Sequence, residues 1–321
     1  MKTMKRVTAA TMAVFMGVAS MTGCGTKSSS DKVTMPETAP EIAKLASERT
    51  NALDSYAMDG TMALDIDAMG QAVKGDITFD AVYFKDPMKL KMDMTIGFES
   101  GDESDEMTAA LYFMKEDDTY TYYMNMNDGE EDQWMKQTLD PEDEDQKSLI
   151  DQLEAGLTGK VETDSALYEK YAMSEEQPDD AVSLDLKITG ADIMNAISES
   201  GVDTSALDSQ LATAGLSTSL FEQIGELPIV TTVDKENVYL KSMSVDMTET
   251  VQTLVDTIME TMMSAYGEAA DKDAYSVTVN KLDMNFNYSD YNAAEDFELP
   301  AEAADAEDMS DTASLLEDAE E

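Results

Sequence analysis

Histidine and cysteine, the side chains that most often carry catalysis or bind transition metals, are nearly missing from this chain. Its 321 residues include no histidine and a single cysteine, Cys24. Without histidine there is no Ser-His-Asp or Cys-His pair and no ordinary His-ligated zinc or haem site. With one cysteine there is no intrachain disulfide and no thiolate cluster for zinc or iron and sulfur. The sequence therefore predicts that the protein is not an enzyme and that it holds no cofactor and no metal.

Carboxylates are the most abundant groups that could do chemistry. The chain has 68 Asp and Glu against 21 Lys and Arg, which gives a formal net charge of -47. Acidic clusters at 99–106, 128–132 and 140–145 could bind Ca²⁺ weakly, but none has the ligand order of an EF-hand. Because so many acids stand together by chance, no glycosidase pair can be nominated, and solvated loops are the favoured interpretation. The charge repels nucleic acid, so we expect no nucleic-acid partner.

Methionines and aromatic residues offer binding rather than catalysis. Flexible thioethers suit a cavity that repacks around varied apolar ligands, although a methionine-tolerant core gives the same pattern. Pairs such as Met92 and Met94 could suggest Cu(I), but a strand face produces a two-residue spacing in any case. Four aromatic residues around one hairpin could stack on sugars, rim a cavity or form cross-strand packing pairs. They are Tyr120, Tyr122, Tyr123 and Trp134.

The N-terminus has the features of a secretory signal over residues 1–23. A basic start precedes an apolar run from Val7 to Met21, which is shorter than the about 20 apolar residues that span a bilayer. The run ends in Met21-Thr22-Gly23-Cys24-Gly25, which resembles the lipobox of bacterial lipoproteins, where cleavage precedes a cysteine that carries diacylglycerol and acyl chains such as palmitate. The alternative is an ordinary cleavage site beside a free cysteine. We expect lipidation at Cys24, a flexible tether over 24–38 and a membrane anchor on the extracytoplasmic face.

Alternation of apolar and polar residues predicts a run of about six strands in the first half of the chain. After a short helix at 40–53, three segments alternate in turn, and the links between them are short enough for an antiparallel meander. An acidic loop at 99–106 then leads to a further strand and to a hairpin around Asn127-Asp128-Gly129. The predicted strands span 56–66, 73–83, 88–98, 107–115, 120–126 and 133–136.

Helical and alternating segments mix in the second half. Strands are predicted at 182–188, 227–233, 238–247 and 275–288, and short helices at 148–157, 165–171, 190–197, 206–214 and 220–224. The last strand changes phase near Asn280, which indicates a β-bulge. The longest helical pattern, Thr250 to Tyr266, carries an apolar stripe over four turns. We expect this helix to lie across the sheet with its stripe buried.

Four segments together resemble the LolA/LppX-like lipoprotein group, which includes lipid carriers. They are Tyr83 to Lys91, Gln133 to Lys136, Val230 to Leu240, and Tyr288 to Pro300. The resemblance implies an α+β fold: a single curved antiparallel β-sheet of about ten strands, a half-barrel, with helices across its concave face. It also implies a hydrophobic cavity between sheet and helices that can hold an acyl chain. The group's carrier is soluble, whereas this chain has an anchor signal, so the delivery role of the carrier does not transfer.

The resulting hypothesis is a membrane-anchored lipoprotein that binds a lipid or other hydrophobic moiety through one domain at 39–300, followed by a disordered acidic tail at 301–321. The alternative is a structural or interaction protein of the cell envelope without a ligand cavity. A solute-binding protein is disfavoured because the long meander lacks βαβ alternation. The sequence leaves the ligand and the oligomeric state open. The residues expected to contact the ligand are Met62, Leu64, Leu90, Met92, Met259, Met262 and Met263.

Overall fold

The computed structural model describes most of the expected domain. The described residues are 33–101, 103–116, 119–127, 132–143, 146–147, 150, 165–199, 225–266 and 276–308. The signal, Cys24 and most of the tether lie outside them. So do the helices expected at 206–214 and 220–224, all but residue 150 of the helix expected at 148–157, and the chain after residue 308.

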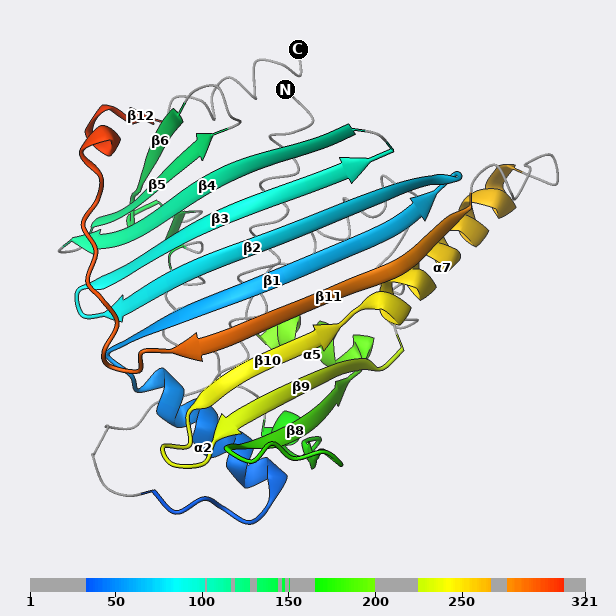
Figure 1. The fold of residues 1–321 in the computed structure, drawn as a ribbon, viewed down its shortest axis with the longest axis horizontal. Coiled ribbons are helices and arrows are strands. Elements are labelled where there is room, and N and C mark those ends of the chain that lie inside the picture. The colour runs from blue at the N-terminus through cyan, green and yellow to red at the C-terminus, as the bar shows by residue number, and fades with distance from the viewer. Residues whose placement is uncertain are drawn as a thin grey trace.

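An open, curved, twelve-stranded sheet forms the body of the molecule (Figure 1). Its strand order is β12-β6-β5-β4-β3-β2-β1-β11-β10-β9-β8-β7. Neighbouring strands are antiparallel, except that β12 runs parallel to β6. The strands are β1 (Ser55–Ala68), β2 (Gln71–Lys85), β3 (Met88–Ser100), β4 (Glu103–Glu116), β5 (Thr119–Asn127), β6 (Asp132–Leu139), β7 (Ala172–Met173), β8 (Ala181–Ile188), β9 (Leu227–Asp234), β10 (Leu240–Asp246), β11 (Val277–Ser289) and β12 (Glu307–Asp308).

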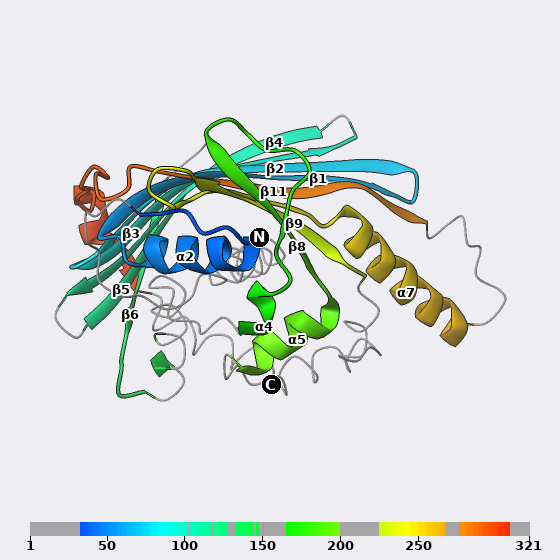
Figure 2. The ribbon, with the colours of Figure 1, turned by 90° about the horizontal axis from the view of Figure 1, so that it is seen from below.

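Among the described residues, three helices lie beneath the concave face of this sheet. They are α2 (Ala39–Asn51), α4 (Ser165–Tyr168) and α5 (Gly190–Glu199), and Figure 2 shows the sheet arching over them. Pro40 stands in the first turn of α2, where its missing amide proton costs nothing. The buried side of α2, which includes Ile42 and Ala46, packs on β8 and β9 through Leu184 and Val233. The expected α+β architecture is therefore present.

The strands form where the sequence alternates. β1 pairs with β2 along its whole length. Even-numbered residues of β1 therefore share a face with odd-numbered residues of β2. The turn between them uses Met69 and Gly70, both at positive φ. Ten of the twelve strands have seven or more residues, and the sequence pattern identified each of them. The higher total comes from β7 and β12, which have two residues each and are too short to show a period.

A β-bulge interrupts β11 at the position that the phase change indicates. Asp65 of β1 pairs with Lys281, and the next residue, Ile66, pairs with Val279. Asn280 is therefore the extra residue, and its side-chain amide donates to the Asp65 carboxylate at 3.0 Å. The predicted bulge is confirmed, and it explains how apolar residues of both parities on β11 reach the same face.

The acidic segment 99–106 is mostly strand, which corrects the expected loop. β3 continues to Ser100 and β4 begins at Glu103, and Glu99 pairs with Ser104. Alternation of apolar residues reports that one face is buried, not that a strand is present. Here the acidic side chains are exposed, so the pattern that identifies the other strands is missing.

The long helix α7 (Thr248–Tyr266) does not cross the concave face, and the prediction that it does is wrong. β10 stops at Asp246, so the first half of β11 lacks β10 as a partner, and α7 runs beside that edge instead (Figures 1 and 2). The Thr248 hydroxyl accepts from the Leu282 amide at 2.9 Å, and the Gln252 side chain bonds both Val277 and Val279. The apolar stripe from Val251 to Met259 is only half-buried.

The chain after β11 forms a strap, residues 290–308, which runs past the ends of β1 to β5 and reaches β6 (Figure 1). The Phe297 ring contacts Phe84 and Tyr112 on the convex face, with centroids 6.1 and 6.0 Å apart. Beyond Pro300 the chain forms a short 3-10 helix, Ala301–Asp305, and then β12. The domain boundary expected at residue 300 is therefore too early, because the folded chain continues to Asp308.

Candidate functional site

Cross-strand pairing collects apolar residues on the concave face in rows. One row runs from Met284 on β11 through Met62, Ile77 and Ile96 to Met107 on β4, each residue directly opposite the next. Paired residues of adjacent strands point to the same face of a sheet. Met284 is fully buried, whereas the other four side chains are half-buried. Burial therefore decreases along the row as it leaves the main core.

The neighbouring rows are apolar as well. Met92 of β3 lies opposite Ala81 and Leu111, and Leu111 lies opposite Met124 of β5. Together the half-buried residues make a continuous surface over β1 to β5, which we call the concave apolar field. It consists of Met62, Leu64, Ile77, Met92, Met94, Ile96, Met107 and Met124.

Gly60 shapes the buried border of this field. A Cβ atom at Gly60 would stand 2.3 Å from the ring of Phe79, which lies opposite on β2. The missing side chain lets the Phe79 ring lie over the β1 backbone and meet Phe286 of β11 at a centroid distance of 5.8 Å. The aromatic pair therefore closes the main core beside Met62, and the field begins where this packing ends.

The structure brings together four of the seven residues that the sequence nominates as ligand contacts. Met62, Leu64, Leu90 and Met92 all lie on the concave face of β1 and β3, and all are half-buried. Leu90 stands between Tyr83 and Phe113, at the well-packed end of the sheet and outside the field. Met259 is half-buried on α7, away from the concave face. The side chains of Met262 and Met263 lie outside the described residues.

Sequence reasoning missed five members of the field. Ile77, Met94, Ile96, Met107 and Met124 carry the same alternating signal as the nominated residues. Finding them needed the register, because the pairing of β2 to β5 decides which residues stand beside Met62 and Met92.

The space between α2 and the sheet is too small for the expected acyl chain. It leaves a cavity of ≈ 30 Å³ lined by Ala43 and Ala46 of α2, Tyr168, Tyr171 and the strands above them. Such a cavity has room for about two water molecules, whereas ligand pockets commonly measure about 300 to 1,000 Å³. The space beneath α2 therefore does not match the cavity that the resemblance implies.

The site is electrically neutral in a strongly acidic protein. No member of the field has an ionisable side chain. Burial raises the pKa of Tyr56, at the border of the main core, to about 12, and burial also raises the pKa of Tyr122 and of Tyr288. These hydroxyls stay protonated at neutral pH, so nothing on this surface offers an anion or a general base. The surface can therefore contact apolar groups.

The four aromatic residues of the β5–β6 hairpin divide between the two faces. Tyr120 and Tyr122 share the concave face with Phe113, whereas Tyr123 and Trp134 lie on the convex face. Trp134 packs against Tyr112 with ring centroids 5.9 Å apart. The expected single aromatic cluster is therefore two separate groups.

Within the described ranges, no three Asp, Glu, His or Cys residues stand close enough together to hold a metal ion. No helix in the described part of the chain is both long and apolar enough to cross a membrane.

Comparison with known families matches residues 38–308 to a family of unknown function, DUF6612. The match covers most of the chain, and the protein belongs to this family. It begins one residue before α2 and ends with β12, which agrees with a domain that includes the strap. No curated protein matches the sequence.

Proposed function

We propose that the protein is a membrane-anchored extracytoplasmic lipoprotein whose concave apolar field binds a lipid or other hydrophobic moiety. The observation that carries the proposal is the field itself, eight half-buried apolar side chains that continue the core across five strands. Five of the eight are methionines, whose unbranched and polarizable side chains adapt to ligands of different shape. The lipobox-like sequence at Cys24 and the likeness to the LolA/LppX-like group support the same proposal.

The charge of the protein narrows the ligand class. With a net charge of -47, the molecule repels anions that approach it. A neutral or zwitterionic lipid, or an apolar segment of a partner, is therefore favoured over a free fatty acid. Lipidation of Cys24 would keep the field close to a membrane surface, where such molecules are concentrated.

Dye binding to the Cys24→Ser protein tests the proposal, because that variant carries no acyl chain of its own. Nile red is the suitable probe, since it is neutral and becomes fluorescent in apolar surroundings. Met62→Gln and Met92→Gln keep side-chain length but add a polar amide within the field. We expect each to weaken dye affinity while costing about 1 kcal/mol of stability, since each side chain is half-buried.

Matched controls come from the convex face of the same strands. Ala63 follows Met62 and Asp93 follows Met92, and both point to the opposite face. Ala63→Gln and Asp93→Gln should leave dye affinity unchanged. Equal dye affinity in all four variants would contradict the proposal.

The small cavity beneath α2 favours a second candidate, a cell-envelope structural or interaction protein without a ligand. In that case the methionines of the field are only the less buried margin of the core. The Cys24→Ser protein would then bind no dye while folded, and the Met→Gln variants would change stability alone.

A further inference from the structure

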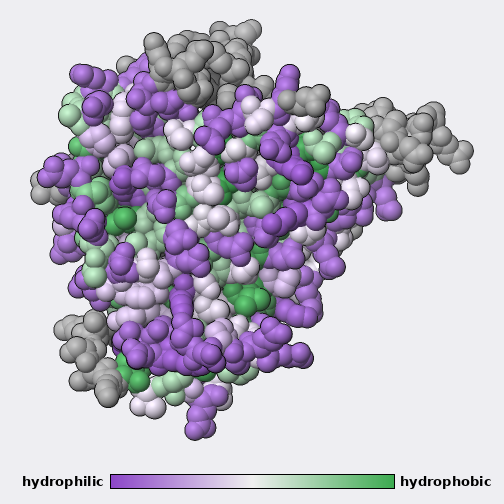
Figure 3. All heavy atoms as spheres, in the orientation of Figure 1, coloured by the Kyte–Doolittle hydropathy of each residue, from purple (hydrophilic) through white to green (hydrophobic). Residues whose placement is uncertain are grey.

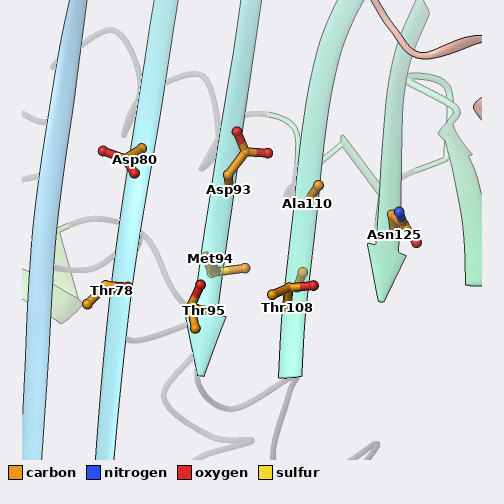
Figure 4. A pocket seen from close by; sticks show the side chains of 9 residues that line it. Thr78, Asp80, Asp93, Met94, Thr95, Thr108, Ala110 and Asn125 are labelled. Atoms are coloured by element: carbon orange, nitrogen blue, oxygen red, sulfur yellow. The ribbon is translucent and has the colours of Figure 1, made fainter. Parts of the chain in front are cut away.

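The convex face of the sheet carries a polar hollow that the proposed function does not use. Polar side chains (purple) are spread over this face in Figure 3, which views it directly. The hollow has a volume of ≈ 230 Å³ and lies over β2 to β5. It forms at Ala110, a small residue between larger neighbours, with Asp93 on one side and Asn125 on the other (Figure 4).

The walls of the hollow come from two adjacent cross-strand rows. In the first row Asp80 lies opposite Asp93, and Ala110 lies between Asp93 and Asn125. In the second row, two residues along each strand, three threonines lie opposite one another (Figure 4). They are Thr78, Thr95 and Thr108.

These groups have unused hydrogen-bonding capacity, chiefly as acceptors. The Asn125 side-chain oxygen is buried and accepts no hydrogen bond from the described part of the chain, although the side-chain nitrogen donates to Asp132 at 3.3 Å. Asp93 pairs with Lys91 at 2.6 Å, whereas Asp80 and the three threonines have no side-chain hydrogen bond within the described part of the chain. A buried acceptor without a donor is unfavourable, so a ligand that brings several donors is favoured.

An aromatic border adjoins the hollow. Trp134 lies directly opposite Asn125 on β6, and its ring packs against Tyr112, two residues from Ala110 on β4. Trp134 is half-buried, so part of its face is open. Aromatic faces next to hydrogen-bonding carboxylate, amide and hydroxyl groups suit a sugar ring, which offers C–H groups on its face and O–H groups at its rim.

Charge and size disfavour anions and drug-sized ligands. Asp80 and Asp93 repel phosphate and other anions. The volume is below the about 300 Å³ at which drug-sized pockets begin, and the site is open to solvent, which suits one unit of a longer chain. We propose that this hollow binds one unit of a neutral saccharide, through Asp80, Asn125 and the threonines, with the sugar bordered by Trp134.

Titration of the full-length protein in detergent micelles with cellotetraose and with chitotetraose tests the proposal. Trp134 is the only tryptophan and lies opposite Asn125, so its fluorescence reports on the border of this hollow, and calorimetry gives an independent isotherm. We expect saturable binding of at least one tetrasaccharide. Spermidine serves as a competing donor ligand of a different class.

Two variants locate the site. Ala110→Leu fills the hollow and should weaken saccharide binding by at least about tenfold. Ala63→Leu makes the same change on the convex face of β1, outside the hollow, and should bind like the unchanged protein. Thr95→Val removes one hydroxyl with little change in shape, so it tests the site even if Ala110→Leu does not fold.

Three results would overturn the proposal. They are the lack of saturable binding of either tetrasaccharide by calorimetry, binding that is unchanged in both Ala110→Leu and Thr95→Val, and saturable binding of spermidine alone. Circular dichroism on each variant shows that the sheet is intact. No variant in this test changes a member of the concave apolar field, so the saccharide proposal stands or falls independently of the proposed function.

Discussion

Replacing Gln252 by Ala should loosen α7 from the sheet. The Gln252 side chain forms hydrogen bonds with backbone groups at the edge of β11 that β10 leaves unpaired, as a neighbouring strand would. Its oxygen accepts from the Val279 amide at 2.6 Å, and its nitrogen donates to the Val277 carbonyl at 3.3 Å. Ala has a higher helix propensity than Gln, so the substitution does not harm the helix itself.

The expected cost follows mainly from these two bonds, because the third bond of the Gln252 side chain, to Asp256 of the same helix at 2.8 Å, is exposed. A typical intramolecular hydrogen bond contributes a net of about 0.5 to 1.5 kcal/mol, and both bonds are only partly buried. Water can replace part of each, so we expect a loss of about 1 to 2 kcal/mol. Thr253→Ala is the control, because its hydroxyl bonds only to Glu249 of the same helix and is exposed. That change should cost less than about 0.5 kcal/mol.

Two measurements check this prediction. Thermal unfolding compares the stabilities of Gln252→Ala and Thr253→Ala, and hydrogen exchange reports protection of the Val279 amide. In Gln252→Ala that amide should exchange faster than in the unchanged protein, while amides in the centre of β1 keep their protection. If Gln252→Ala matches Thr253→Ala in stability and Val279 keeps its protection, Gln252 does not hold the edge and the described role of α7 is wrong.

Three further predictions concern the sheet and its strap. Gly60→Ala should cost about 1 to 3 kcal/mol, because a Cβ would stand 2.3 Å from the Phe79 ring, and an unchanged melting temperature would contradict this packing. Phe297→Ala should cost about 2 kcal/mol, since the half-buried ring contacts Phe84 and Tyr112, and limited proteolysis should then cut the strap faster. Burial raises the pKa of Tyr56 from 10.0 to about 12. The contribution of its protonated hydroxyl to folding stability is therefore complete below about pH 10 and is lost as the pH rises through 12. Tyr56→Phe should therefore resist alkaline unfolding better than the unchanged protein, and identical pH profiles would contradict the burial of this hydroxyl.

Apolar alternation was enough to predict the ten longer strands, and a change of its phase was enough to predict the bulge at Asn280. Both features are visible in the sequence pattern, because one face of the sheet is buried and the other is not. The same rule failed at 99–106, where five of the eight residues are acidic and the described acidic side chains are exposed, so no apolar alternation appears. Burial and strand formation are separate properties, and only the first is visible in the pattern.

The placement of α7 could not be predicted from its stripe. An apolar stripe indicates that a helix packs against another element, but the element that α7 packs against depends on where β10 ends. Because β10 stops at Asp246, the edge of β11 was open, and Thr248 and Gln252 satisfied its backbone groups. Likewise Met62 and Met92 could be nominated singly, but their union with Ile77 and Ile96 in one field required the register of three strands.

Native mass spectrometry of the Cys24→Ser protein, purified from its host without added lipid, tests the central claim most directly. We expect an added mass that organic solvent extracts as a hydrophobic molecule. We also expect the Met62→Gln, Met92→Gln double variant to lose this mass while Ala63→Gln keeps it. A folded apoprotein of the bare chain mass, unchanged after incubation with vesicles of neutral phospholipid, would contradict the claim that the concave apolar field is a binding site.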